Sequence, residues 1–248
     1  MCGRYALILP PEAIRQLFQF LNPVWAQGIP NWAARYNVAP TQSVPVLCAG
    51  GTLAIMRWGL VPHWAKDIAS APLINARGES LRDKPSFRDA FSARRCLVPA
   101  NGFYEWREEA GQKIPMYIRL RSKEPLVFGG IWERWRRPDG SNLDSMAIIT
   151  TPANAHIGQL HDRMPLILGA QDWKAWLDLP PGDAQGVVRP CPDDWLEYFT
   201  VSQRVNSVTN DGPDLIEPED TASSGTPSPR RQTSKKKIKP DGGQGSLF

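Results

Sequence analysis

The strongest constraint on the fold is a series of short apolar or alternating runs, cut by proline, glycine and asparagine. Runs of this length suit strands, and the frequent breaks favour antiparallel neighbours joined by short turns. The predicted strands cover residues 5–9, 43–47, 53–60, 95–98, 102–106, 116–120, 126–135 and 146–151. The pattern therefore predicts an α+β fold in which antiparallel β-structure dominates, as a compact, barrel-like assembly.

Three segments have the features of short helices. Residues 11–20 begin with a proline, which fits the first turn of a helix. Residues 87–92 follow Ser86 as a cap, with Asp89 three residues on, and residues 171–177 form the third segment. The chain has no internal repeat and no glycine-rich phosphate loop. At 248 residues it is long enough for one sizeable core, and two large domains are not expected.

Composition changes sharply after Ile216. Residues 217–248 hold one aromatic side chain, Phe248, among Ser, Thr, Pro, Gly and charged residues. Such a segment cannot bury enough apolar surface to offset its ordering entropy. We therefore predict a folded domain at residues 1–216 and a disordered tail at residues 217–248. The net charge is +4, and the tail, with six basic and four acidic residues, carries half of it.

Composition also excludes several classes of protein. No apolar run approaches the roughly 20 residues that a bilayer span needs, so neither a membrane anchor nor a secretory signal is expected. The four cysteines, Cys2, Cys48, Cys96 and Cys191, are far apart and form no C-x-x-C pair. This spacing suggests neither a zinc cage nor a disulfide framework, and we predict a cytoplasmic protein without metal or cofactor.

The first residues, Met1-Cys2-Gly3-Arg4, carry distinctive chemistry. Because residue 2 is small, we expect Met1 to be removed, which leaves Cys2 with a free α-amine beside its thiol. Such a 1,2-aminothiol condenses with an aldehyde: the amine forms a Schiff base and the thiolate closes a thiazolidine ring. An α-amine with a pKa of about 8 is partly neutral at physiological pH, unlike a lysine at about 10.4. A cysteine at position 2 can also be incidental, so the dipeptide alone leaves both interpretations open.

Three polar segments interrupt apolar surroundings. On a strand, Asn75 and Arg77 would point to one face and could hold a phosphate and its sugar; in a loop, Asn75 would cap a turn. Glu105 lies between aromatic residues, either as the polar face of an edge strand or as a desolvated acid–base group. His161 is the one histidine of three that is flanked by charge, and we take it as the candidate.

Six motifs in order along the chain resemble the SRAP family, named SOS-response-associated peptidases and understood as abasic-site shields. They are Cys2-Gly3-Arg4-Tyr5, Tyr36-Asn37-Val38-Ala39-Pro40, Arg57-Trp58-Gly59-Leu60-Val61-Pro62, Ile74-Asn75-Ala76-Arg77, Gly102-Phe103-Tyr104-Glu105-Trp106 and His161-Asp162-Arg163-Met164-Pro165. The resemblance runs from Cys2 to about Ile216. It implies a covalent thiazolidine between the N-terminal cysteine and the ring-opened aldehyde of an abasic site in single-stranded DNA.

The resemblance also implies a catalytic set of Cys2, Asn75, Glu105 and His161. His161 would move a proton at the sugar ring oxygen and so promote opening to the aldehyde. Glu105 would orient the Cys2 amine, relay protons in the lyase-like Schiff-base step and assist reversal of the crosslink. Asn75 would hold the sugar or Cys2 in register. No cofactor is implied.

A second set of residues is expected to hold DNA. It comprises Arg4, Arg77 and Arg163 as bidentate phosphate ligands, with Pro40, Trp64 and Trp106 beside the bases. Stacking on tryptophan is indifferent to sequence, as a lesion reader requires. Pro40 and Trp64 could form a wedge that tolerates duplex on one side only, although residues 63–71 follow the family pattern loosely. For Trp58 we predict core packing.

The tail ends in Gln244-Gly245-Ser246-Leu247-Phe248. This end resembles the Q-x-[SD]-L-F pentapeptide that bacterial replication and repair proteins insert into the sliding clamp, with Gln244, Leu247 and Phe248 as anchors. An arbitrary five-residue end is the alternative. The expected partners are therefore abasic single-stranded DNA and a sliding clamp, for a monomer that acts on the nucleoid at replication forks.

Two rival functions are compatible with these residues. A cysteine peptidase, at most one that processes its own Met1, could use the Cys/His/Glu set, but no oxyanion-hole motif accompanies Cys2. A non-catalytic adaptor that joins single-stranded DNA to the clamp would leave Cys2 inert. Replacing Cys2 by alanine separates the adaptor from the crosslinker.

Overall fold

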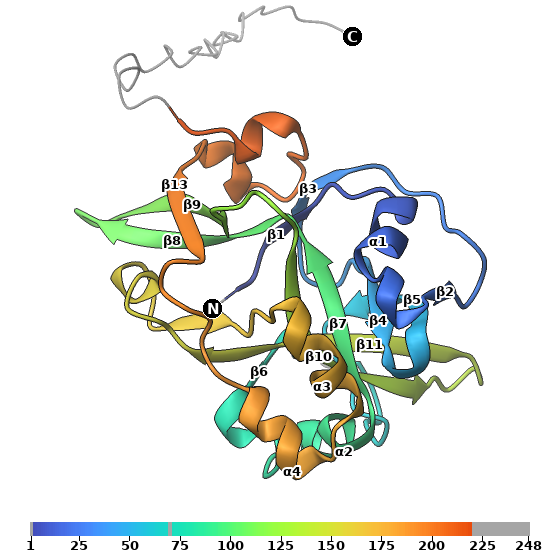
Figure 1. Cartoon of the computed structure of the whole chain (residues 1–248). Coiled ribbons are helices and arrows are strands. Elements are labelled where there is room, and N and C mark those ends of the chain that lie inside the picture. The colour runs from blue at the N-terminus through green and yellow to red at the C-terminus, as the bar shows by residue number, and fades with distance from the viewer. Residues whose placement is uncertain (1, 69–70, 220–248) are drawn as a thin grey trace, which may run out of the picture.

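Two β-sheets dominate the computed structural model, which describes residues 2–68 and 71–219. The helices lie around the sheets, and the chain begins between them (Figure 1). The predicted α+β class with dominant antiparallel β-structure is confirmed, because only three of the strand pairings are parallel. Those three join β5 to β11, β6 to β11 and β2 to β5.

The five-stranded sheet has the order β13-β9-β8-β1-β3 and is antiparallel throughout. Its strands are β13 (Leu196–Thr200), β9 (Gln112–Leu120), β8 (Gly102–Glu109), β1 (Tyr5–Leu7) and β3 (Arg35–Val38). Ala110 and Gly111, both at positive φ, form the two-residue turn between β8 and β9. This turn type matches the natural twist of paired strands and explains the long hairpin at this point.

The eight-stranded sheet contains a closed barrel. Its strands are β12 (Arg163–Pro165), β11 (Asn142–Pro152), β10 (Leu126–Arg136), β7 (Arg95–Ala100), β4 (Ser43–Cys48), β5 (Thr52–Trp58), β2 (Val24–Trp25) and β6 (Asn75–Arg77). Because β5 pairs with both β4 and β11, the path through β11, β10, β7, β4 and β5 closes on itself. Closure leaves these strands with few free edges.

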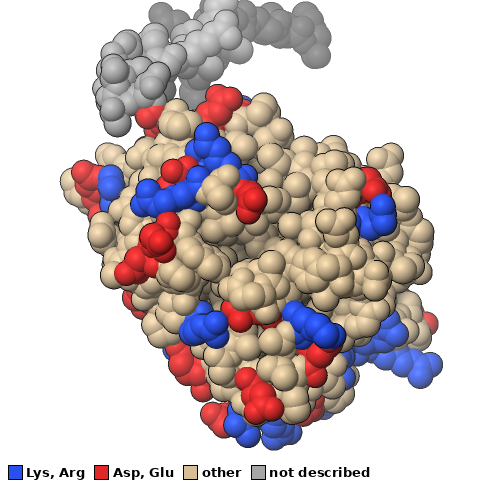
Figure 2. All heavy atoms as spheres, viewed as in Figure 1, with Lys and Arg blue, Asp and Glu red and all other residues tan. Residues whose placement is uncertain are grey.

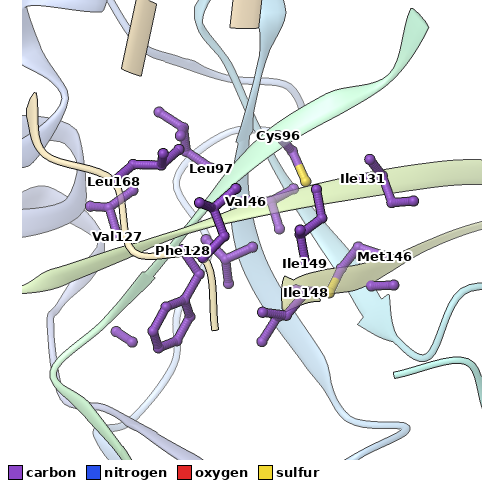
Figure 3. Packing of buried hydrophobic residues seen from close by; sticks show 14 of the residues in the cluster. Val46, Cys96, Leu97, Val127, Phe128, Ile131, Met146, Ile148, Ile149 and Leu168 are labelled. Atoms are coloured by element: carbon purple, nitrogen blue, oxygen red, sulfur yellow. The ribbon is translucent and has the colours of Figure 1, made fainter. Parts of the chain in front are cut away.

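Apolar side chains from the barrel strands form the main core. Val46 of β4, Leu97 of β7, Phe128 of β10 and Ile148 of β11 are all fully buried and pack together (Figure 3). A second, smaller cluster contains Ala6, Tyr104, Tyr117, Val201, Val205 and Leu215. It joins the five-stranded sheet to the last described turns of the chain.

The helices are short and differ in detail from the prediction. They are α1 (Pro11–Leu17), α2 (Pro85–Ala93), α3 (Ala170–Asp178) and α4 (Pro181–Ala184). The first ends three residues early, and a 3-10 turn follows it. The second begins at Pro85, whose fixed φ suits the first turn, and no side chain caps it. The predicted cap at Ser86 was therefore wrong.

All eight predicted strands are present, with bounds shifted by a few residues. The prediction missed β2, β3, β6, β12 and β13, which have between two and five residues each. In residues 2–68 and 71–219, no helix is long and apolar enough to span a bilayer.

The predicted tail lies almost wholly outside the described residues, and so do Gln244, Leu247 and Phe248 of the clamp motif. Residues 217–219 are described and exposed, and the Glu219 amide donates to the Thr200 carbonyl at 2.8 Å. The disorder of the tail and its clamp motif stay predictions.

Candidate active site

The chain starts alongside β8, which carries Glu105. Tyr5 of β1 pairs with Phe103, and the Tyr104 amide donates to the Arg4 carbonyl at 3.0 Å. This antiparallel register carries the residues before β1 along β8 toward Glu105. Cys2 and Glu105 are both buried, at 0% and 3% exposure. The structure thus brings these two predicted catalytic residues into one buried place.

The thiol of Cys2 is held in its protonated form. Burial is the main cause that raises its pKa, and the negative charge of Glu105 raises the pKa further. The Cys2 Sγ donates weakly to the Arg4 carbonyl at 3.9 Å. At neutral pH the thiol therefore keeps its proton until a base or an approaching cation makes its loss favourable.

Asn75 ties Cys2 to the other sheet. Its Nδ2 donates to the Cys2 carbonyl at 2.9 Å. The Asn75 Oδ1 atom is buried and accepts no hydrogen bond from residues 2–68 or 71–219. One end of the amide thus fixes the nucleophilic residue, while the other has hydrogen-bonding capacity that a bound substrate could use.

Packing between the sheets explains why Cys2 and Asn75 meet. The ring of Tyr5 contacts Trp58 edge-to-face, with centroids 5.2 Å apart. The Trp58 Nε1 donates to the Ile74 carbonyl at 2.9 Å, directly before Asn75. Both the start of β1 and the start of β6 are therefore held by one fully buried indole, which confirms Trp58 as a core residue.

His161 precedes β12, on the far side of β11 from β6. The residue Thr150 of β11 pairs with Arg77 of β6 on one edge and with Pro165 of β12 on the other. The end of β11 therefore lies between β6, which contains Asn75, and β12, which directly follows His161 and Asp162 in the chain.

Two neighbours share one ring nitrogen of His161. The Arg163 amide donates to Nδ1 at 2.9 Å, and Asp162 Oδ1 lies 2.7 Å from the same atom. A neutral ring that accepts at Nδ1 carries its proton on Nε2, whereas a protonated ring donates from Nδ1 to Asp162. Each protonation state has a partner, which suits a group that gives and takes a proton.

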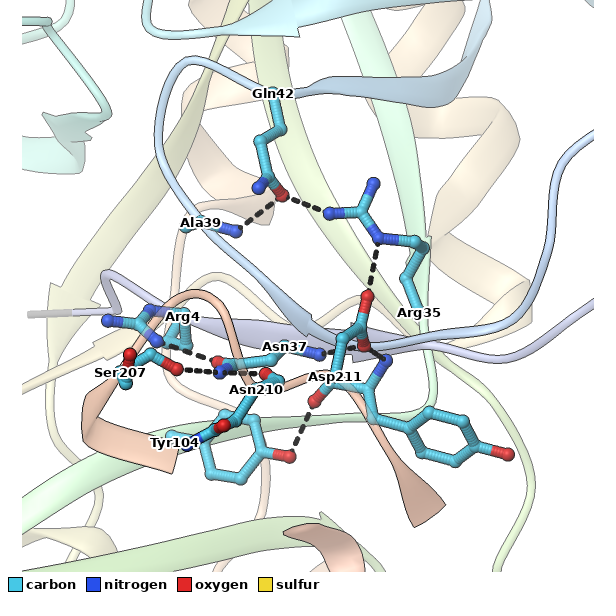
Figure 4. A network of polar contacts seen from close by, with 10 residues as sticks. Arg4, Arg35, Asn37, Ala39, Gln42, Tyr104, Ser207, Asn210 and Asp211 are labelled. Carbon is cyan, nitrogen blue, oxygen red and sulfur yellow. Dashed lines mark hydrogen bonds and ion pairs between the residues drawn. The ribbon is translucent and has the colours of Figure 1, made fainter. Parts of the chain in front are cut away.

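The three predicted phosphate-binding arginines differ in surroundings. Arg77 is exposed at the end of β6. Arg4 is half-buried, and its Nη1 donates to Asn37 Oδ1 at 2.7 Å (Figure 4). The same atom donates to the Val205 carbonyl at 2.9 Å. Arg163 forms a two-pronged ion pair with Glu79. Two of the three guanidinium groups therefore already have protein partners.

Comparison with known proteins identifies the family. A sequence model described as SOS response associated peptidase (SRAP) matches residues 1–208. The chain belongs to the SRAP family. It is 39% identical over 225 residues to abasic site processing protein YoqW of Bacillus subtilis, a match that covers 88% of this chain and 99% of that one. It is 30% identical over 263 residues to abasic site processing protein HMCES of Gallus gallus, a match that covers 88% of this chain and 78% of that one.

A solved structure supports the fold of this SRAP chain. An X-ray structure of a protein from Bacteroides thetaiotaomicron superposes with a TM-score of 0.78, covering 88% of this chain and all of that one. Its sequence identity is 22%, so the likeness concerns the fold alone.

The predicted base-contacting residues of this SRAP chain lie in three different settings. Trp106 is half-buried, and its Nε1 donates to Asn206 Oδ1 at 2.7 Å. Trp64 is 56% exposed, in a loop after β5. Pro40 is half-buried and precedes Thr41, which has a positive φ of 73°. Trp64 alone presents most of its surface to solvent, whereas one edge of Trp106 is fixed by the protein.

Sequence reasoning assigned no role to Asn37 or Glu79. Asn37 lies in the quoted Tyr36-Asn37-Val38-Ala39-Pro40 motif, and a polar residue inside a buried strand was the available signal. Its amide donates to the carbonyls of Ser207 and Asn210 (Figure 4) and to that of Val205. Glu79 is two residues beyond Arg77, but its ion pair with Arg163 spans 84 positions of sequence, which no local pattern reveals.

Surface charge and possible metal ligands are two further properties that bear on binding. On the face shown in Figure 2, Lys and Arg side chains lie above and below a largely uncharged centre, and acidic side chains are interspersed with them. In the part of the chain that the structure describes, no group of three or more His, Cys, Asp or Glu residues could hold a metal ion.

Proposed function

We propose that this SRAP protein captures abasic sites in single-stranded DNA as a covalent thiazolidine on Cys2. The observation that carries the proposal is the position of Cys2, the second residue of the chain, which is buried beside Glu105 and held by Asn75. An incidental cysteine near a chain start needs no such surroundings. The names of the two relatives, which are abasic site processing proteins, support the same lesion.

The reaction begins after removal of Met1. The free amine of Cys2 attacks the aldehyde carbon of the ring-opened sugar, and uptake of one proton with loss of one water molecule gives the protonated Schiff base. The thiol sulfur then adds to the same carbon, its proton leaves, and the C=N double bond becomes a single bond. Overall, one aldehyde and one aminothiol give one thiazolidine and one water molecule.

Each polar neighbour has a step available to it. A protonated His161, paired at Nδ1 with Asp162, can donate its Nε2 proton to the sugar ring oxygen while the anomeric hydroxyl loses its proton to solvent, which opens the cyclic hemiacetal. Glu105 can accept the proton that the amine releases and later the proton of the thiol. Because burial, and after it the charge of Glu105, raises the pKa of the thiol, we expect the amine to react first and the sulfur second. Asn75 keeps Cys2 in place through both steps.

DNA would lie across the face of the molecule that carries the candidate active site. Arg77 and Arg163 flank the end of β11 and Arg4 follows Cys2, so phosphates on both sides of the lesion find a cation. The exposed indole of Trp64, with Pro40 and Trp106, would contact the neighbouring bases. The crosslink would shield the lesion during replication and the SOS response, and the tail would bring the protein to a sliding clamp.

A denaturing gel tests the proposal directly. Purified protein is mixed with single-stranded DNA that carries one abasic site, or with the same strand carrying an intact base. We expect a slow-migrating band for wild type and for Cys48→Ala, which removes a different buried thiol, and none for Cys2→Ala. Intact mass should give the protein without Met1, plus the DNA, less one water.

Other outcomes would favour the rival functions. No band from wild type, with DNA binding retained, would contradict the proposal and favour a non-catalytic adaptor. Cleavage of peptides that Cys2→Ala abolishes, again without a band, would favour the peptidase.

A further inference from the structure

Glu79, which the proposed mechanism does not use, occupies the edge of Arg163 that a phosphate would take. Arg163 Nη1 donates to Glu79 Oε1 at 2.5 Å, and Arg163 Nη2 donates to Glu79 Oε2 at 3.0 Å. Arginine binds carboxylate and phosphate through the same planar fork of donors. A phosphate on Arg163 must therefore displace this carboxylate or share the guanidinium with it.

The charge of Arg77 also acts on this carboxylate. The hydrogen bond from Arg163 is the largest cause that lowers the pKa of Glu79, and the charges of Arg163 and Arg77 lower it further. Glu79 therefore stays ionised at neutral pH and offsets part of the positive charge of both arginines. These two arginines are the proposed phosphate ligands around the end of β11.

The two partners of the ion pair are held very differently. The side chain of Arg163 is only 13% exposed, and its Nη2 also donates to the Thr150 carbonyl at 2.7 Å. The side chain of Glu79 is 50% exposed and lies in the 3-10 turn Gly78–Ser80. Partly exposed ion pairs of this kind add little stability. Glu79 is therefore the partner that can turn into solvent while Arg163 stays in place.

We propose that Glu79 is a specificity-determining residue that keeps the affinity for undamaged single strands low by competing with phosphate for Arg163. This inference rests on the proposed function. A strand with an abasic site needs only brief reversible contact with the protein before the covalent bond retains it. An intact strand is held by reversible contact alone. Weak phosphate binding therefore releases intact strands without loss of captured lesions.

Equilibrium binding to a fluorescein-labelled intact single strand, measured over a range of salt concentrations, tests this role. We expect Glu79→Gln to bind about three to ten times more tightly than wild type at low salt. We also expect a salt dependence steeper by about 0.7 in log Kd against log salt, as for one added phosphate contact.

Glu12→Gln is the matched control, because Glu12 also forms a two-pronged pair with an arginine, Arg15, and the substitution changes the net charge equally. It lies in α1, on the opposite side of the molecule from β6 in Figure 1. We expect wild-type affinity from this variant. Thermal unfolding of both variants checks that each is folded.

A competition experiment measures the consequence for capture. Crosslinking to an abasic strand is followed with and without excess intact strand. We expect the intact strand to slow crosslinking by Glu79→Gln more than crosslinking by wild type.

Two results of the binding measurement would overturn the role of Glu79. One is an affinity of Glu79→Gln for the intact strand that is equal to or below that of Glu12→Gln. The other is a higher affinity with an unchanged salt slope. Failure of wild type to crosslink without competitor would instead overturn the proposed function, and the binding measurement would still decide the role of Glu79.

Discussion

At Cys2 the α-amine and the thiol would act on one carbon atom, and the surroundings of the side chain decide their order. Burial and the charge of Glu105 both raise the pKa of the thiol, so the sulfur is a poor nucleophile until the Schiff base carries a positive charge. In the proposed reaction Glu105 would thus have two opposite effects: it helps burial to keep the thiol protonated at rest, and it would provide a base during the reaction.

These two effects can be separated by Glu105→Gln. Loss of the negative charge lowers the pKa of the Cys2 thiol, and each unit by which it falls gives about tenfold more thiolate at a fixed pH below that pKa. We expect Cys2 alkylation by a small reagent, followed by peptide mass spectrometry, to rise severalfold and its pH midpoint to move down. Crosslinking should fall, because the proton acceptor is lost.

The control is Glu133→Gln, which removes another carboxylate that is 3% exposed, in β10. It should leave the alkylation profile of Cys2 unchanged. An identical profile for Glu105→Gln and wild type would contradict an effect of Glu105 on the thiol.

At the scale of elements, the last described turns of the chain cover β3, the edge strand of the five-stranded sheet. They include the 3-10 turns Gln203–Asn206 and Pro213–Ile216. Asp211 accepts hydrogen bonds from the Tyr36 and Asn37 amides, and the Asn37 side chain binds three carbonyls of the covering segment (Figure 4). Asn37 also accepts from Arg4, two residues from Cys2. The segment therefore both protects a sheet edge and positions Arg4.

Asn37→Ala should show the importance of this contact. The substitution removes hydrogen bonds at 2.8 and 3.0 Å to carbonyls of the segment and leaves buried groups without partners. We expect a loss of about 2 to 4 kcal/mol in the free energy of unfolding, measured in urea, and slower crosslinking because Arg4 loses one of its two acceptors.

Tyr104→Phe provides the comparison, because it removes one hydroxyl that donates to the Tyr36 carbonyl at 2.6 Å. It should cost about 1 kcal/mol and leave Arg4 in place. The contribution of Asn37 would be refuted by an equal loss of stability in the two variants.

At the scale of the whole molecule, the folded body and the tail should separate by function. Residues 220–248 contain six basic and two acidic residues. We expect deletion of this segment to leave thermal unfolding and crosslinking unchanged, to lower affinity for intact DNA at low salt and to abolish capture by a sliding clamp. A thermal melt, a denaturing gel, equilibrium DNA binding and a clamp pull-down measure these four effects.

Alanine at both Leu247 and Phe248 should remove clamp capture as completely as the deletion, while DNA affinity stays as in wild type. Clamp capture that survives both changes would refute the tail motif. A large fall in thermal stability on deletion would show that the tail is part of the folded body.

Local sequence pattern determined most of the sheet strands and the chemistry at the chain start. Alternation and turn residues predicted eight strands because these signals act within a few residues. The five strands outside that prediction are short, and β6, which the sequence left open between strand and loop, exists because it pairs with β11, far away in sequence. The β-strand propensity of their own residues is too weak to predict them from sequence.

The sequence alone pointed to an aminothiol at Cys2 and, through the family resemblance, to Asn75, Glu105 and His161. Only the tertiary structure decided that Cys2 is buried, that Asn75 holds its carbonyl and that Glu79 pairs with Arg163. The physical reason is that residue type fixes which bonds a side chain can form. Its pKa and its partners depend on which distant segments the fold brings against it.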